Sequence, residues 1–166
     1  MPAGGPGMKF PKPPRGAKAI PWRMPIWIYR QGMDWLLGSR ALLLSHKGRK
    51  SGKTRQTVLE IIHHSPGDQT YYVVSGFGAQ SHWYKNIQHE PRVKIQVGSK
   101  RRDAIATQLE PDEAEWVFFS YAQKHPRALR GLANLLDYEL SHSPEGVRSF
   151  GREIPVIQFS AKDNRL

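Results

Sequence analysis

Residues 56–75 read QTVLEIIHHSPGDQTYYVVS and carry the clearest structural signal in the chain. Residues 56–64 and 70–75 are rich in β-branched and aromatic side chains, which favour strands. Between them, Ser65-Pro66-Gly67-Asp68 has the composition of a tight turn. The stretch therefore predicts an antiparallel hairpin with strands over 56–64 and 70–75.

Four more strands are predicted on either side of this hairpin. In RVKIQV, apolar and polar residues alternate, which is the pattern of a strand with one buried face. The other three stretches are ALLLSH, RDAIATQL and IPVIQF. The four predicted strands cover residues 41–46, 92–97, 102–109 and 154–159.

Helical signals separate these strands. A short helix is expected after an N-cap at Ser81, stopped by Pro91. A second helix is expected to open at Pro111-Asp112-Glu113 and to close at Pro126, with acids in its first turn. Residues 128–140 look helical as well. In the second helix, three apolar side chains lie at helical spacing: Trp116, Phe119 and Ala122.

The ends of the chain suggest one domain with an N-terminal arm. The 166 residues suffice for a single domain with a real core. Residues 1–21 are rich in Pro and Gly, are basic and contain no acid, so we expect a flexible arm, followed by one domain over 22–166. The stretch 25–38 predicts a helix, either docked on the core or lying as an amphipathic anchor on an anionic membrane.

Composition narrows the fold and function classes. Five or six short antiparallel strands with inserted helices predict a mainly β, α+β fold, closer to a small barrel than to a doubly wound sheet. The chain has no cysteine, which excludes disulfides and cysteine-based chemistry. It also lacks both an apolar stretch long enough for a membrane helix and an apolar signal-peptide core, so we expect a cytoplasmic protein.

The net charge of +11 is concentrated in the N-terminal third. Residues 1–56 contain twelve Lys or Arg side chains and a single acid, Asp34, whereas the remaining residues are neutral. Such a basic segment suits a polyanion: a nucleic acid, an anionic lipid, or a phosphorylated or polycarboxylate cofactor.

Two glycine-rich stretches resemble nucleotide-binding motifs without matching them. Residues 48–54, GRKSGKT, have three residues between the glycines where a P-loop has four, and a predicted strand follows instead of a helix. Residues 76–81, GFGAQS, lack the parallel unit of a dinucleotide fold. The first stretch remains a cationic hairpin loop that suits an anion, and the second exposes backbone amides beside a helix start.

The histidines do not indicate a metal or a hydrolase. His63 and His64 are adjacent in a predicted strand, so their side chains point to opposite faces and cannot chelate one ion together. We expect no bound metal. No GxSxG sequence is present, which leaves serine-hydrolase chemistry unsupported.

Three stretches taken together resemble the deazaflavin-dependent nitroreductase and quinone reductase family, which binds coenzyme F-420 on a split β-barrel of the FMN-binding type. They are LLLSHKGRKSGKTR, VVSGFGAQSHWYKNIQHEPRVKIQVG and REIPVIQF, and the resemblance covers about residues 26–160. It implies that the domain over 22–166 is a split barrel that binds this cofactor.

The resemblance also implies a set of site residues. Those expected to hold the cofactor's phosphate and oligoglutamate tail are Gly48, Arg49, Lys50, Ser51 and Arg55. Those expected near the deazaflavin ring are Ser75, Trp83, Tyr84 and Asn86. Thr57, Gly76 and Phe77 are also expected to contact the cofactor, although Thr57 and Gly76 stand where well-known nitroreductases carry other residues. Tyr138 is a candidate proton donor or acceptor contact.

The resulting hypothesis is an oxidoreductase that passes hydride from reduced F-420 to an electron-poor small molecule, such as a quinone, a conjugated carbonyl or a nitro compound. One alternative is an FMN-binding reductase on the same barrel. Another is a non-catalytic module for nucleic acid or an anionic membrane, with the basic N-terminal third as its contact. The protein is expected to be a monomer or a homodimer, with nucleic acid the less favoured partner.

Overall fold

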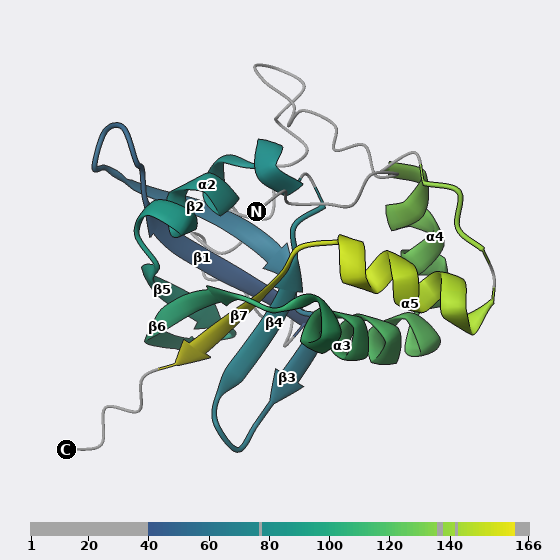
Figure 1. The fold of residues 1–166 in the computed structure, drawn as a ribbon. Helices are drawn as coiled ribbons and strands as arrows, with labels where there is room; N and C mark the ends of the chain where they lie inside the picture. Colours follow the sequence, from purple (N-terminus) through teal and green to yellow (C-terminus); the bar gives the residue numbers. More distant parts are fainter. Residues whose placement is uncertain (1–39, 77, 136–137, 142, 162–166) are drawn as a thin grey trace.

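The computed structural model describes residues 40–76, 78–135, 138–141 and 143–161 (Figure 1). Its strands are β1 (Ala41–Lys47), β2 (Thr54–Glu60), β3 (His63–Ser65), β4 (Thr70–Val74), β5 (Arg92–Val97), β6 (Lys100–Gln108) and β7 (Val156–Ala161). Its helices are the 3-10 turn η4 (Gly78–Gln80), α2 (His82–His89), α3 (Pro111–Lys124), α4 (Pro126–Leu135) and α5 (Pro144–Glu153). The expected arm over 1–21 and helix over 25–38 lie outside the described residues.

The seven strands form one sheet in the order β2-β1-β5-β6-β7-β4-β3, and each neighbouring pair is antiparallel. Figure 1 shows this sheet curling on itself, with α2 close to β1 and β2, and with α3, α4 and α5 gathered to one side. The expected α+β class with antiparallel strands and inserted helices is confirmed.

Alternation along the strands builds the interior of the barrel. Leu42 and Leu44 of β1 are fully buried on the inner face, and Leu44 pairs with Ile95 of β5. Helix α2 adds Trp83 and Ile87 to this apolar cluster. Burying an aliphatic or aromatic side chain of this size contributes about 1.5–3 kcal/mol to the stability of the fold. These contacts therefore hold the sheet in its curled form and α2 in its place on it.

The predicted strand over 56–64 is wrong in one respect, because the structure divides it into β2 and β3. Strand β2 pairs with β1, and β3 pairs with β4. At the break, the Ile61 amide donates to the Arg40 carbonyl, whereas the Ile62 amide donates to the Tyr72 carbonyl, at 2.8 Å each. Two consecutive amides therefore bond near opposite ends of the strand order, one just before β1 and the other in β4. The chain turns between them, and the number of strands becomes seven instead of six.

Helix α3 is where the sequence places it, but its buried face differs from the expected one. Trp116 is 63% exposed and Phe119 is half-buried, whereas Val117, Phe118 and Tyr121 are buried. The expected face is therefore correct at Ala122, which is 4% exposed, and wrong at Trp116 and Phe119. The buried side chains of α3 pack in a cluster with α4 and α5, whereas the Trp116 ring meets the His63 ring of β3 edge to face at a centroid distance of 5.7 Å.

Helix α5 was not predicted, although its start carries a standard signal. Ser143 caps the helix by accepting a hydrogen bond from the Gly146 amide at 3.1 Å, and Pro144 occupies the first turn. The helix packs on α3 through Phe150 and Phe118, whose ring centroids lie 5.3 Å apart.

In the described ranges, no helix is long and apolar enough to cross a membrane.

Candidate cofactor-binding site

The loop between β1 and β2, residues 48–53, is a tight turn held by backbone hydrogen bonds. The Gly48 amide donates to the Lys53 carbonyl at 2.9 Å, and the Gly52 amide donates to the Gly48 carbonyl at 2.8 Å. Gly52 has φ +66°, a conformation that favours glycine, and a Cβ on Gly48 would lie 2.9 Å from Ser51 Oγ. A strand follows the loop, so the exclusion of a P-loop is confirmed.

This cationic loop presents its charges to solvent. Lys50, Lys53 and Arg55 are exposed, and Arg49 is half-buried at the base of the turn. No carboxylate within the described residues forms an ion pair with any of these four cations. Four basic side chains on one hairpin therefore create a positive surface that favours a polyanionic ligand.

Asn86 of α2 joins the cationic loop to the body of the barrel. Its Oδ1 accepts the Arg49 backbone N–H at 3.1 Å and the Arg49 Nη1 at 3.0 Å. Asn86 is 4% exposed and Arg49 is half-buried, so the pair lies where the loop meets the barrel. The structure thus brings together two predicted site residues that stand 37 positions apart in the sequence.

Behind Asn86 lies His46 of β1, which sequence reasoning did not select. Its Nδ1 is 3.0 Å from Asn86 Nδ2, and the side chain is buried. Burial and, secondarily, the positive charge of Arg55 lower the pKa of His46 to about 4. No local motif marks this residue, because its partner is 40 positions away.

The predicted residues of β2 lie on the same side of the sheet as His46. Arg55 pairs with His46 in the register, and Thr57 pairs with Leu44. Since directly paired residues in an antiparallel sheet project to the same face, Arg55 and Thr57 share the face of the sheet on which Asn86 meets His46. Thr57 is half-buried, so this face of β2 continues from the cationic loop toward the barrel interior.

Ser75, at the end of β4, holds the turn that leads into α2. Its hydroxyl is fully buried, donates to the Gly78 carbonyl at 3.1 Å and lies 3.5 Å from Ser81 Oγ. Ser81 occupies the predicted N-cap position of α2 but makes no side-chain capping bond. Gly76 is half-buried in this turn, and Phe77 lies outside the described residues.

Trp83 and Tyr84 are buried in the barrel cluster, where they anchor α2. The Tyr84 hydroxyl donates to Gln108 Oε1 of β6 at 2.6 Å, and the two rings meet edge to face with centroids 6.2 Å apart. Burial raises the pKa of Tyr84, so its phenol stays protonated at neutral pH. Contact of either ring with a deazaflavin stays a prediction.

Tyr138 lies in a different part of the molecule from the cationic loop. It packs against the apolar cluster formed mainly by α3, α4 and α5, which we call the helical cluster. Its ring centroid lies 4.7 Å from that of Phe150, and its amide donates to the Ala133 carbonyl. Its role as a proton donor or acceptor contact stays a prediction.

Within the described part of the chain, no group of three or more His, Cys, Asp or Glu side chains has the arrangement of a metal site.

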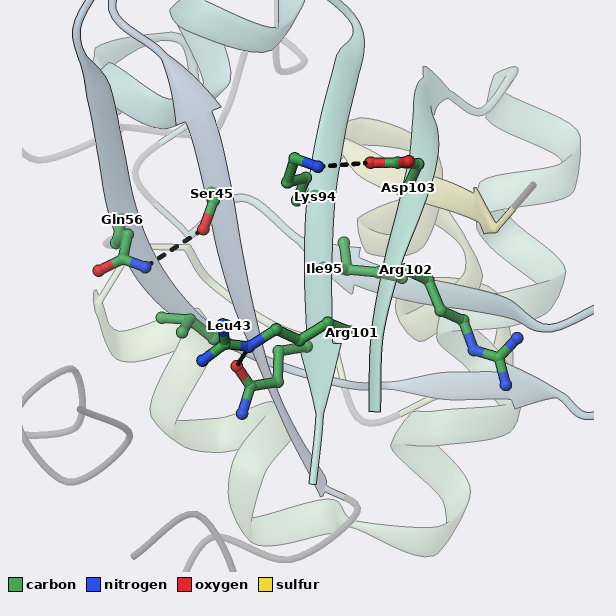
Figure 2. Close-up of a pocket in the computed structure, with 9 residues that line it drawn as sticks. Leu43, Ser45, Gln56, Lys94, Ile95, Arg101, Arg102 and Asp103 are labelled. Carbon is green, nitrogen blue, oxygen red and sulfur yellow. Dashed lines mark hydrogen bonds and ion pairs between the residues drawn. The ribbon is translucent and has the colours of Figure 1, made fainter. Parts of the chain in front are cut away.

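A pocket of about 340 Å³ lies on the other face of β1, where Ser45 and Lys94 pair across β1 and β5. Figure 2 shows that its polar side chains already meet one another: Gln56 donates to Ser45 at 3.3 Å, and Lys94 pairs with Asp103 at 3.1 Å. None of the predicted site residues lines it. The cationic loop and this pocket are therefore separate features.

The fold and part of the sequence match known proteins. The curated protein "Putative F420H(2)-dependent quinone reductase Rv3178" of Mycobacterium tuberculosis is 35% identical over 74 residues, which are 43% of this chain and 60% of that protein. The structure of F420-H2 Dependent Reductase (FDR-A) superposes with a TM-score of 0.52 at 24% identity, over 73% of this chain and 94% of that one. This match confirms the expected split-barrel fold.

A second solved structure, described as a domain-swapped dimer, matches with a TM-score of 0.51 at 24% identity, over 81% of this chain and 98% of that one. The model of the family described as F420H(2)-dependent quinone reductase matches residues 25–129, more than half of the chain. That range contains the cationic loop, the Ser75 turn and α2, but not Tyr138. The resemblance seen in the sequence is thereby confirmed: the chain belongs to the F420H(2)-dependent quinone reductase family, a family of oxidoreductases whose cofactor is coenzyme F-420.

Proposed function

We propose that this protein binds coenzyme F-420 with its phosphate and oligoglutamate tail on the cationic loop, and reduces a quinone. The observation that carries the proposal is the loop itself. Together with the start of β2, it presents Arg49, Lys50, Lys53 and Arg55 without an ion-paired carboxylate in the described residues. A tail of several carboxylates complements such a surface.

The loop combines Arg and Lys side chains, and both types of cation suit a ligand with a phosphate and several carboxylates. An Arg guanidinium forms paired hydrogen bonds with phosphate or carboxylate oxygens, whereas a Lys ammonium acts as a mobile point charge. Exposed ion pairs contribute only about 0.2–1 kcal/mol each, so affinity for the tail requires several of them together. Arg49 differs from the rest because its bonds to Asn86 fix it in place before the ligand arrives.

We propose that the deazaflavin ring of the cofactor lies against the turn at Ser75 and the start of α2. Both Ser75 and Ser81 are buried, and their hydroxyls lie 3.5 Å apart, which ties the end of β4 to the start of α2. Reduced F-420, when bound, supplies a hydride from C5 of its deazaflavin. The chain's own contribution is to hold the ring in one orientation and to keep water from the reacting face.

Among the three acceptor classes considered, a quinone is our choice over a conjugated carbonyl or a nitro compound, and the description of the family supports it. The sequence lacks the lysine that well-known nitroreductases carry after the serine, since Gly76 stands there. We therefore expect menadione-like quinones to be reduced faster than nitroaromatic compounds.

A fluorescence titration of the purified protein with F-420, run beside one with FMN, tests the proposal. Saturable binding of F-420 at micromolar or lower concentration, with no FMN binding, is the expected result. A preference for FMN would overturn the choice of cofactor. Binding of neither, together with salt-dependent binding of DNA or anionic vesicles, would overturn the enzymatic function altogether.

A further inference from the structure

Three side chains form a continuous hydrogen-bonded series from the barrel to the cationic loop. His46 lies on β1, Asn86 on α2 and Arg49 in the loop. His46 Nδ1 is 3.0 Å from Asn86 Nδ2, and Asn86 Oδ1 accepts both the backbone and the guanidinium of Arg49. The series therefore joins a strand, a helix and the cationic loop through side chains.

The Arg49 end of the series fixes the orientation of the Asn86 amide. A backbone N–H and a guanidinium only donate hydrogen bonds, so both must face an acceptor. Asn86 therefore points its carbonyl oxygen at Arg49, and its amide nitrogen is left facing the histidine ring. A flipped amide would set donor against donor at Arg49 on two bonds at once.

The Asn86 amide in turn fixes the state of the histidine. Because Asn86 Nδ2 donates, His46 Nδ1 has to accept, which requires a neutral ring with its proton on Nε2. The surroundings favour this state, since burial and the nearby charge of Arg55 lower the pKa of His46 to about 4. At neutral pH the ring is therefore a permanent acceptor.

We propose that His46 is a positioning residue for cofactor binding, whose neutral ring acts through Asn86 to hold Arg49 in the orientation that receives the anionic end of the ligand. The inference rests on the proposed function, which supplies the ligand. It adds that binding of the phosphate and tail depends on a side chain that is itself only 5% exposed.

Two variants of His46 separate this role from simple packing. His46→Leu keeps the apolar volume and removes the acceptor, so the Asn86 amide loses its constraint. His46→Asn places a carbonyl oxygen near the position of Nδ1 and restores the acceptor. We expect His46→Leu to weaken F-420 binding by up to roughly tenfold, the largest effect of losing one hydrogen bond between neutral groups, and His46→Asn to recover most of it.

A comparison of two ligands makes the test specific to the anionic end of the cofactor. F-420 is compared with its riboside precursor form, which has the same deazaflavin ring but no phosphate or glutamates. The expected result is that His46→Leu lowers affinity for F-420 and leaves that for the riboside unchanged. Equal losses for both ligands would show a general packing defect and overturn the inference.

Nitrogen NMR of the wild-type protein without cofactor provides a second readout that needs no variant. We expect His46 to show the neutral form protonated on Nε2 between pH 5.5 and 7.5. A ring protonated on Nδ1, or a charged ring in this range, would overturn the inference even with F-420 binding intact. Failure of the wild type to bind F-420 would overturn the proposed function instead, and with it the ligand-positioning role.

Discussion

The Tyr121 hydroxyl of α3 donates a hydrogen bond to Glu60 Oε1 at the end of β2, across 2.8 Å. Tyr121 is 7% exposed, and burial together with the Glu60 carboxylate raises its pKa well above the usual value. The bond ties the helical cluster to the strand end immediately before the chain turns from β2 into β3. It therefore fixes the position of the strand end at the bend relative to α3.

Removing this hydroxyl should destabilise the protein without unfolding it. We expect Tyr121→Phe to lower the free energy of unfolding by about 1–2 kcal/mol, because a bond to a charged acceptor is lost while the ring stays packed. Urea denaturation followed by fluorescence measures the change. Glu60→Gln keeps an acceptor oxygen and should cost less than Tyr121→Phe, and the opposite order would contradict the assignment of the bond.

Charge reversal in the cationic loop should affect binding and leave stability unchanged. Lys50 is exposed, so Lys50→Glu should lower affinity for F-420 by tenfold or more while the melting temperature stays constant. Lys100→Glu provides a matched control, because Lys100 is also exposed but lies outside the cationic loop, at the start of β6. Titrations of both variants in low and moderate salt measure the effect, and equal affinity of the two would refute a role for the loop.

The lowered pKa of His46 predicts a loss of stability in acid. The unfolded chain takes up a proton near pH 6.5, whereas the folded protein resists it down to about pH 4. Stability is therefore full above pH 6.5 and declines as the pH falls toward 4, by about 3 kcal/mol in total. Denaturation curves at pH 7.5 and 4.5 measure this decline, and it should be smaller in His46→Asn, which cannot titrate there.

Two glycines in helices provide opposite expectations for the same substitution. A Cβ on Gly151 of α5 would lie 3.1–3.2 Å from Phe118 atoms, so Gly151→Ala should overpack the contact between α3 and α5 and cost about 1 kcal/mol. Gly131 of α4 has nothing within 4 Å of such a Cβ, so Gly131→Ala should stabilise the protein by about 0.5–1 kcal/mol. Thermal unfolding compares the two, and a shift in the same direction would contradict the packing.

Local pattern was enough to predict most strands and helices of this fold. The alternation in RVKIQV and the Pro111 helix start depend on neighbouring residues only, and both elements were predicted correctly. The division at Ile61 and Ile62 was not, because it depends on which distant strands the two amides meet. The exposed side of Trp116 was missed for the same reason, since tertiary contacts decide the buried face of a helix.

The site shows the same division between local and distant information. The cationic loop was visible as a run of basic residues around two glycines, and it lies on a hairpin as expected. His46 was invisible, because a single histidine in an apolar strand has no distinguishing neighbour. Its significance appears only when folding places Asn86 beside it.

The position of β7 in the sheet has a consequence for how the protein is made. Strand β7 is the last described element of the chain, yet it lies between β6 and β4 and pairs with both. During synthesis, β2-β1-β5-β6 and the β3–β4 hairpin emerge earlier and lack the strand that bridges them. The barrel is therefore completed only after residue 161 has left the ribosome, and a nascent chain stalled before that point exposes two unpaired strand edges for a chaperone to bind.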